Sequence, residues 1–150
     1  MKHKLLLLLA TGFGVGYIPL ASGTFGSIVA FPFFLWIYCK WNWGLQTIVC
    51  TIGFFMSVSI ATYAENVFNE KDSGKIVIDE ILGMWVTFIG IPLTLPTAIA
   101  GFLFFRLFDI WKFNPMDRLQ ALSGGWGIVA DDVVAGIFAN ILLHIFTKVF

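Results

Sequence analysis

Charged residues are scarce in this 150-residue sequence, where Asp, Glu, Lys and Arg together make up 12%. An ordinary soluble domain is about one quarter charged. Hydrophobic residues make up 59%, including 17 Phe and 6 Trp. So little polar surface excludes an ordinary soluble domain and indicates a chain surrounded by lipid. Because 9 acidic residues balance 9 basic ones, the net charge indicates no nucleic-acid partner.

Histidine and cysteine are also rare, with 2 of each. His3 and His144 are isolated, which argues against phosphatases that use a histidine nucleophile with a second histidine. Cys39 and Cys50 lie in apolar stretches, so we expect small hydrophobes rather than a disulfide. No Cys/His zinc spacing, no Ser/His/Asp order and no Asp-x-Asp loop after a strand is found, which argues against the corresponding hydrolases.

In contrast to the scarce charged residues, long uncharged segments are present in the sequence. Residues 44–64 form an uncharged run of 21 residues, enough to cross a bilayer, and residues 28–39 are predicted as the body of an earlier crossing. Residues 1–9 mimic a signal peptide, but no small-residue cleavage pattern follows, so we expect this segment to be retained. Residues 5–10 are too short to cross a bilayer and are predicted as a short helix at the membrane interface. Residues 11–27 hold 5 glycines, 1 proline and no charge, which predicts a re-entrant segment.

This glycine-rich segment has two interpretations. With Ser22 or Thr24 as the cap of a following helix, it would form a cradle for an anion. Otherwise it is a turn that lets helices approach each other closely. The residues of this segment are compatible with both interpretations.

The run at residues 81–105 determines the predicted fold, because it carries no charge. As one straight helix it would hold Asp79 about 45 Å from Asp109, on opposite sides of a membrane. Pro92 and Pro96 interrupt the run, and two prolines four residues apart break a helix. We therefore predict a helical hairpin over about 76–113, with arms at about 76–90 and 97–113.

The hairpin would return Arg106 and Asp109 to the side of the membrane that holds the other acidic pairs. The last helix is predicted from about residue 128, with its acidic pair in the first turn. Five carboxylates would then converge: Asp79, Glu80, Asp109, Asp131 and Asp132. Buried anions need cations, and a hard divalent ion such as Mg2+ takes oxygen ligands of this kind. Arg106 and Lys112 lie three residues to either side of Asp109, where they would hold phosphate oxygens.

A simpler alternative explains each acidic group separately. Carboxylates such as Asp131 and Asp132 near a helix N-terminus interact favourably with the helix dipole. Arg106 and Asp109 would then pair only with each other. This alternative does not explain why all the clusters would lie on one face.

The resulting fold prediction is all-α: a multi-pass integral membrane helical bundle that forms one domain over residues 1–150. Its distinguishing parts are the proline-broken hairpin and the glycine-rich re-entrant N-terminal segment. Basic residues predominate on the acidic side, against Lys40 opposite, and this bias predicts that the acidic side faces the cytoplasm. These residues are Lys71, Lys75, Lys112 and Arg118.

Five ordered blocks resemble the phosphatidylglycerophosphatase A family. They are GFGVG at 12–16, GTFGS at 23–27, KDSGKIVIDE at 71–80, FRLFDIWK at 105–112 and GGWGIVADDVVAG at 124–136. The resemblance implies a bacterial inner-membrane enzyme that hydrolyses phosphatidylglycerophosphate to phosphatidylglycerol with Mg2+. It carries over to the five carboxylates as catalytic and metal-binding residues. It also implies substrate contacts by Arg106, Lys112, Thr24 and Ser27.

Two routes of hydrolysis are compatible with these residues: direct attack by water, or a covalent phosphoenzyme on one carboxylate. Two other classes of function are compatible with parts of this pattern. A small ion transporter or channel would use intramembrane carboxylates and broken helices. A lipid-binding subunit without chemistry would tolerate Asp109→Asn and Asp131→Asn. The oligomeric state and the selectivity for acyl chain and headgroup are left open.

Overall fold

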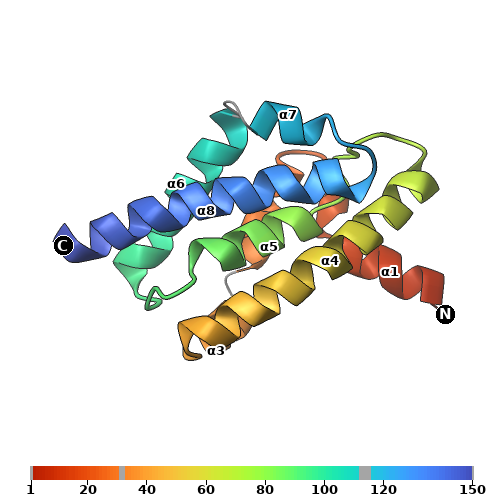
Figure 1. The fold of residues 1–150 in the computed structure, drawn as a ribbon. Helices are drawn as coiled ribbons and strands as arrows, with labels where there is room; N and C mark the ends of the chain where they lie inside the picture. Colours follow the sequence, from red (N-terminus) through yellow and green to blue (C-terminus); the bar gives the residue numbers. More distant parts are fainter. Residues whose placement is uncertain (1, 31–32, 112–115, 150) are drawn as a thin grey trace.

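The computed structural model describes residues 2–30, 33–111 and 116–149, which are helices joined by turns with no strand among them. Figure 1 shows the chain as a helical bundle. The elements are α1 Lys2–Ala10, the 3-10 helix η1 Val15–Tyr17, α2 Ser22–Val29, α3 Phe33–Tyr38, α4 Trp43–Phe68, α5 Ile78–Thr87, α6 Leu95–Trp111, α7 Met116–Gln120 and α8 Gly125–Val149. The predicted all-α class is thus confirmed.

Helix α5 lies at the centre of the bundle, between the two long helices α4 and α8 (Figure 1). Two glycines make the contact with α8 close. A Cβ at Gly136 would lie 2.5 Å from the carbonyl oxygen of Gly83, and a Cβ at Gly83 would lie 2.5 Å from the Phe105 ring of α6. Small residues therefore bring α5, α6 and α8 into one core, in which Met84 and Leu143 are fully buried.

Two of the described helices, α4 and α8, are long and apolar enough to cross a membrane. The crossing predicted at 44–64 falls inside α4, which runs to Phe68. The crossing predicted at 28–39 is not one helix, because α2 ends at Val29 and α3 begins at Phe33. Pro32 stands between them in the sequence, and a proline disfavours helix at the residue before it.

The helix break predicted at the two prolines is present. Helix α5 ends at Thr87 and α6 begins at Leu95, so Pro96 occupies the second helical position, where no N–H is needed. Thr94 and Thr97 cap α6 reciprocally: the Thr94 amide donates to Thr97 Oγ1 at 2.8 Å, and the Thr97 amide donates to Thr94 Oγ1 at 3.3 Å. Beyond this cap, α6 packs against both α8 and α5.

Side chains from α4 and α8 satisfy the backbone of this turn. The Gln46 side-chain oxygen accepts from the Gly90 amide at 2.7 Å. The Asn140 amide donates to the carbonyl oxygens of Thr87 and Ile89 at 2.9 and 2.8 Å. These bonds replace those that a continuous helix would have made.

The glycine-rich segment packs against the stretch that precedes α5. The Val77 amide donates to the Ala10 carbonyl at 2.9 Å, and the Ser22 hydroxyl donates to the Gly74 carbonyl at 2.6 Å. A Cβ at Gly26 would lie 2.8 Å from the Val77 side chain. Close approach is therefore one purpose of these glycines, as the packing interpretation predicts.

The predicted helix caps are wrong. Ala21, with φ of 54°, precedes α2 and offers no side-chain acceptor, while Ser22 is turned to Gly74. At Ser22 a tertiary contact thus uses the hydroxyl that a local cap would have used.

Candidate active site

Three carboxylates from two helices form the core of the site. Asp79 and Glu80 lie in the first turn of α5, and Asp132 lies on α8. One carboxylate oxygen from each lies within 4.8 Å of the other two, a spacing that allows all three to bind one metal ion. Asp79 and Asp132 are only 7% and 4% exposed. The predicted meeting of the acids at 79, 80 and 132 is therefore present in the fold.

Asp131 adjoins this group without belonging to it. Among the described residues that could hold an ion together, only Asp79, Glu80 and Asp132 are close enough. Asp131 is buried and acts electrostatically on Asp79. Helix α8 begins at Gly125, three residues before the predicted start, so Asp131 and Asp132 lie beyond its first turn. Since dipole stabilisation falls off within one turn, it does not account for burying this pair.

The electrostatics of the three carboxylates are unfavourable without a cation. Burial, and then the neighbouring Glu80 and Asp132, raise the pKa of Asp79 above its usual range. Asp79 Oδ1 and Glu80 Oε2 are buried and have no hydrogen-bond partner among the described residues. Buried oxygens without donors cost free energy unless something else binds them. A hard divalent cation fits this site, because every candidate ligand atom is a carboxylate oxygen.

Arg106 and Asp109 of α6 border the acidic group. Arg106 Nη1 donates to Asp109 Oδ2 at 2.5 Å, and both side chains are largely buried. Both also act electrostatically on Glu80. Asp109 thus lies beside the group as the ion-pair partner of Arg106, rather than within it. Arg106 Nε is buried without a hydrogen-bond partner in the described structure, so the guanidinium keeps a donor for an anion.

The backbone of helix α2 lies against Glu80 and Arg106. A Cβ at Gly23 would collide with Glu80 Oε1 and would lie 3.3 Å from Arg106 Nη1. The close approach of Gly23 is a feature that the residue pattern did not single out, although the residue lies in the GTFGS block. Thr24 is half-buried in the same turn. Ser27 is fully buried and its hydroxyl donates to the Gly23 carbonyl at 2.8 Å, so it is committed to the helix in this structure.

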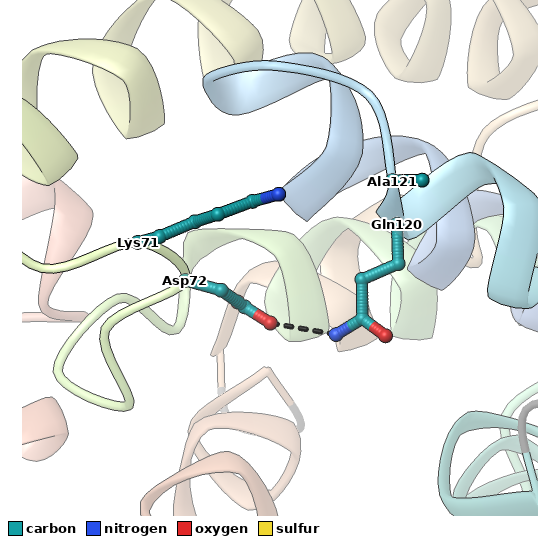
Figure 2. A pocket seen from close by; sticks show the side chains of 4 residues that line it. All are labelled: Lys71, Asp72, Gln120 and Ala121. Atoms are coloured by element: carbon teal, nitrogen blue, oxygen red, sulfur yellow. Dashed lines mark hydrogen bonds between the residues drawn. The ribbon is translucent and has the colours of Figure 1, made fainter.

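Lys112, a predicted substrate contact, lies outside the described residues. A separate hollow of about 380 Å³ lies between the loop after α4 and the end of α7, where the described lining residues are Lys71, Asp72, Gln120 and Ala121 (Figure 2). The Gln120 amide donates to Asp72 Oδ2 at 2.7 Å and ties the two segments together. None of these lining residues belongs to the acidic group.

Comparison with known proteins gives consistent matches. The profile of the family described as phosphatidylglycerophosphatase A matches residues 8–147. The chain is 36% identical to phosphatidylglycerophosphatase A of Escherichia coli K12 over 91% of this chain and 80% of that protein. It is 33% identical to the protein of the same name from Haemophilus influenzae, over 91% and 85%.

A third relative carries a different name. The chain is 30% identical to a putative phosphatidylinositol-3-phosphatase of Bacteroides thetaiotaomicron over 93% of this chain and 91% of that protein. No solved structure matches the chain. The family profile and two of these relatives agree over nearly the whole sequence, and the chain therefore belongs to the phosphatidylglycerophosphatase A family.

Proposed function

We propose that this chain is a membrane-embedded lipid phosphatase that hydrolyses the terminal phosphomonoester of phosphatidylglycerophosphate to phosphatidylglycerol and phosphate. Family membership supports the substrate. The observation that carries the proposal is the buried group of Asp79, Glu80 and Asp132, whose oxygens lie within 4.8 Å of one another beside Arg106. Several carboxylates that could hold a metal ion, with an arginine beside them, form an arrangement suited to metal-assisted phosphoryl transfer.

Asp79, Glu80 and Asp132 would hold Mg2+, with Asp131 and Asp109 completing the negative field around them. Bound there, the ion would polarise the phosphoryl group and lower the pKa of a coordinated water. Arg106 would bind phosphoryl oxygens through its remaining donors and neutralise the charge that develops on them. Thr24 and Lys112 are proposed as further contacts to the substrate, and Ser27 as a support for the turn at Gly23.

The reaction replaces one P–O bond by another. On the direct route a water oxygen attacks phosphorus and the bond to the glycerol oxygen breaks. On the covalent route a carboxylate oxygen attacks phosphorus first, and water then breaks the carboxylate–phosphorus bond. The glycerol oxygen takes up a proton, so that phosphatidylglycerol and inorganic phosphate leave. A phosphoenzyme trapped from labelled substrate would indicate the covalent route, whereas its absence during turnover would indicate direct attack by water.

The site is proposed to lie at the cytoplasmic surface of a bacterial inner membrane, within a single domain over residues 1–150. Helices α4 and α8 are the candidate crossings. The C-terminal end of α4 and the N-terminal ends of α5 and α8 lie at one end of the bundle (Figure 1). A headgroup would enter at this end while the acyl chains stay in the bilayer.

Phosphate release from phosphatidylglycerophosphate in detergent micelles tests this proposal. We expect activity with Mg2+, loss of activity with EDTA, and a loss of about 100-fold or more in Asp79→Asn and Glu80→Gln. Glu65→Gln, on α4 and outside the acidic group, is the control and should retain activity. Metal-independent turnover, or full activity in both site variants, would contradict the proposal.

Phosphatidylinositol 3-phosphate should be assayed in parallel, because the Bacteroides relative is named for that substrate. We expect faster turnover of phosphatidylglycerophosphate, in agreement with the family profile. Faster turnover of the inositol lipid would reassign the headgroup while leaving the metal-assisted chemistry in place.

A further inference from the structure

An apolar groove lies between α2 and α6, on the surface of the bundle. Its volume is about 250 Å³, and its described lining residues are Ile28, Ala98, Ile99, Phe102 and Leu103. All five side chains are hydrocarbon, and no polar surface lines the groove. The groove therefore offers nothing to a headgroup, a metal ion or a phosphate, and suits a hydrocarbon chain.

The groove adjoins the carboxylate site along both of its helices. On α6, Leu103 precedes Arg106 by three residues, a rise of about 4.5 Å along the helix axis. On α2, Ile28 follows Gly23 by five residues, a rise of about 7.5 Å. Arg106 and Gly23 are the residues that meet at Glu80. One end of the groove thus lies next to the site, and the groove extends away from it.

A phospholipid has the matching division of chemistry, with a phosphate group at one end and hydrocarbon at the other. We propose that this groove binds one acyl chain of the lipid whose phosphomonoester is hydrolysed at the acidic site. The inference rests on the proposed function, and it adds a binding site for the hydrocarbon part of the substrate. Binding a remote part of a substrate helps to orient the reacting group, so the groove would contribute to turnover of long-chain lipids.

Exposed isoleucines of α8 provide matched positions outside the groove. Ile137 and Ile141 of α8 are 46% and 51% exposed, close to the values of 47% for Ile28 and 54% for Ile99. Neither of the α8 residues lines the groove. They are matched positions at which the same substitution should touch only bulk lipid or detergent.

The experiment compares Ile28→Trp and Ile99→Trp with Ile137→Trp and Ile141→Trp. Each protein is assayed for phosphate release from two forms of phosphatidylglycerophosphate. One form has acyl chains of roughly sixteen carbons and the other has acyl chains of roughly four carbons, so the two lipids differ strongly in the hydrocarbon surface that the groove could bury. A tryptophan in the groove should raise KM for the long-chain lipid about 10-fold. For the short-chain lipid, kcat and KM should stay within about twofold, and the α8 variants should match the unsubstituted chain on both lipids.

Other outcomes would overturn the proposal. Equal losses on both lipids in the groove variants would mean that the groove supports the fold or the site instead of a chain. Unchanged kinetics on both lipids would mean that bulk lipid alone covers it. A change in oligomeric mass with the groove variants, together with equal losses on both lipids, would assign the groove to a second copy of the chain. Failure of the unsubstituted protein to release phosphate from either lipid would instead refute the proposed function itself.

Discussion

At the scale of single residues, the missing side chain of Gly23 allows the backbone of α2 to lie against Glu80 and Arg106. We predict that Gly23→Ala lowers the rate of phosphate release about 100-fold, because even small displacements of reacting groups are costly. The added Cβ would displace the end of the Glu80 side chain, which is able to move, so the unfolding temperature should change little. Steady-state kinetics and thermal unfolding in detergent measure the two effects.

Gly74→Ala provides the control for this substitution. A Cβ at Gly74 would make only an ordinary contact of 3.7 Å with the Ser22 hydroxyl. This variant should therefore retain activity within about twofold. Normal activity in Gly23→Ala would show that the close approach of α2 has no bearing on the chemistry.

At the scale of helices, the turn between α5 and α6 depends on side chains from outside it. Asn140 donates to two backbone carbonyls, those of Thr87 and Ile89. Asn140→Leu would leave both without this partner, at a cost of about 1–3 kcal/mol for each. We predict a loss of about 2–6 kcal/mol in the free energy of unfolding, measured by denaturant titration in mixed micelles.

Asn66→Leu is the matched control for this prediction. Asn66 is exposed and its amide donates to the Thr62 carbonyl one turn earlier in the same helix. Its replacement should change the free energy of unfolding by less than about 0.5 kcal/mol. Similar losses in the two variants would indicate that the turn does not depend on α8.

At the scale of the whole molecule, the site and the α3–α4 connection lie at opposite ends of the bundle (Figure 1). Lys71 and Lys40 mark these two ends and both are exposed. With Cys39 and Cys50 replaced by alanine, we predict that Lys40→Cys reacts with an impermeant maleimide in intact spheroplasts. Lys71→Cys should react only after permeabilisation, because the basic end is expected in the cytoplasm.

Inverted vesicles provide the complementary measurement, since they expose the cytoplasmic surface. There Lys71→Cys should react and Lys40→Cys should not. The opposite labelling pattern would place the site at the periplasmic surface. Reaction of both cysteines in intact spheroplasts would contradict a structure that separates the two ends by a bilayer.

Much of the fold could be predicted because its signals are local. The uncharged run at residues 44–64 predicts a long apolar helix, and Pro92 with Pro96 predicts the break that α5 and α6 show. The cap at Ser22 was wrong because the distant carbonyl of Gly74 accepts from that hydroxyl. The start of α8 was late by three residues, since a Gly-Gly pair is an ordinary turn signal but begins the helix here.

The sequence alone determined an all-helical, lipid-compatible chain with several acidic pairs next to apolar runs, because composition, run length and prolines act through nearby residues. The sequence did not determine which acidic residues lie together in one site. Only the tertiary structure separated Asp79, Glu80 and Asp132 from Asp109, which pairs with Arg106. The physical reason is that helix rotation and approach depend on packing across the core, where Gly83 and Gly136 bring α5 against α8.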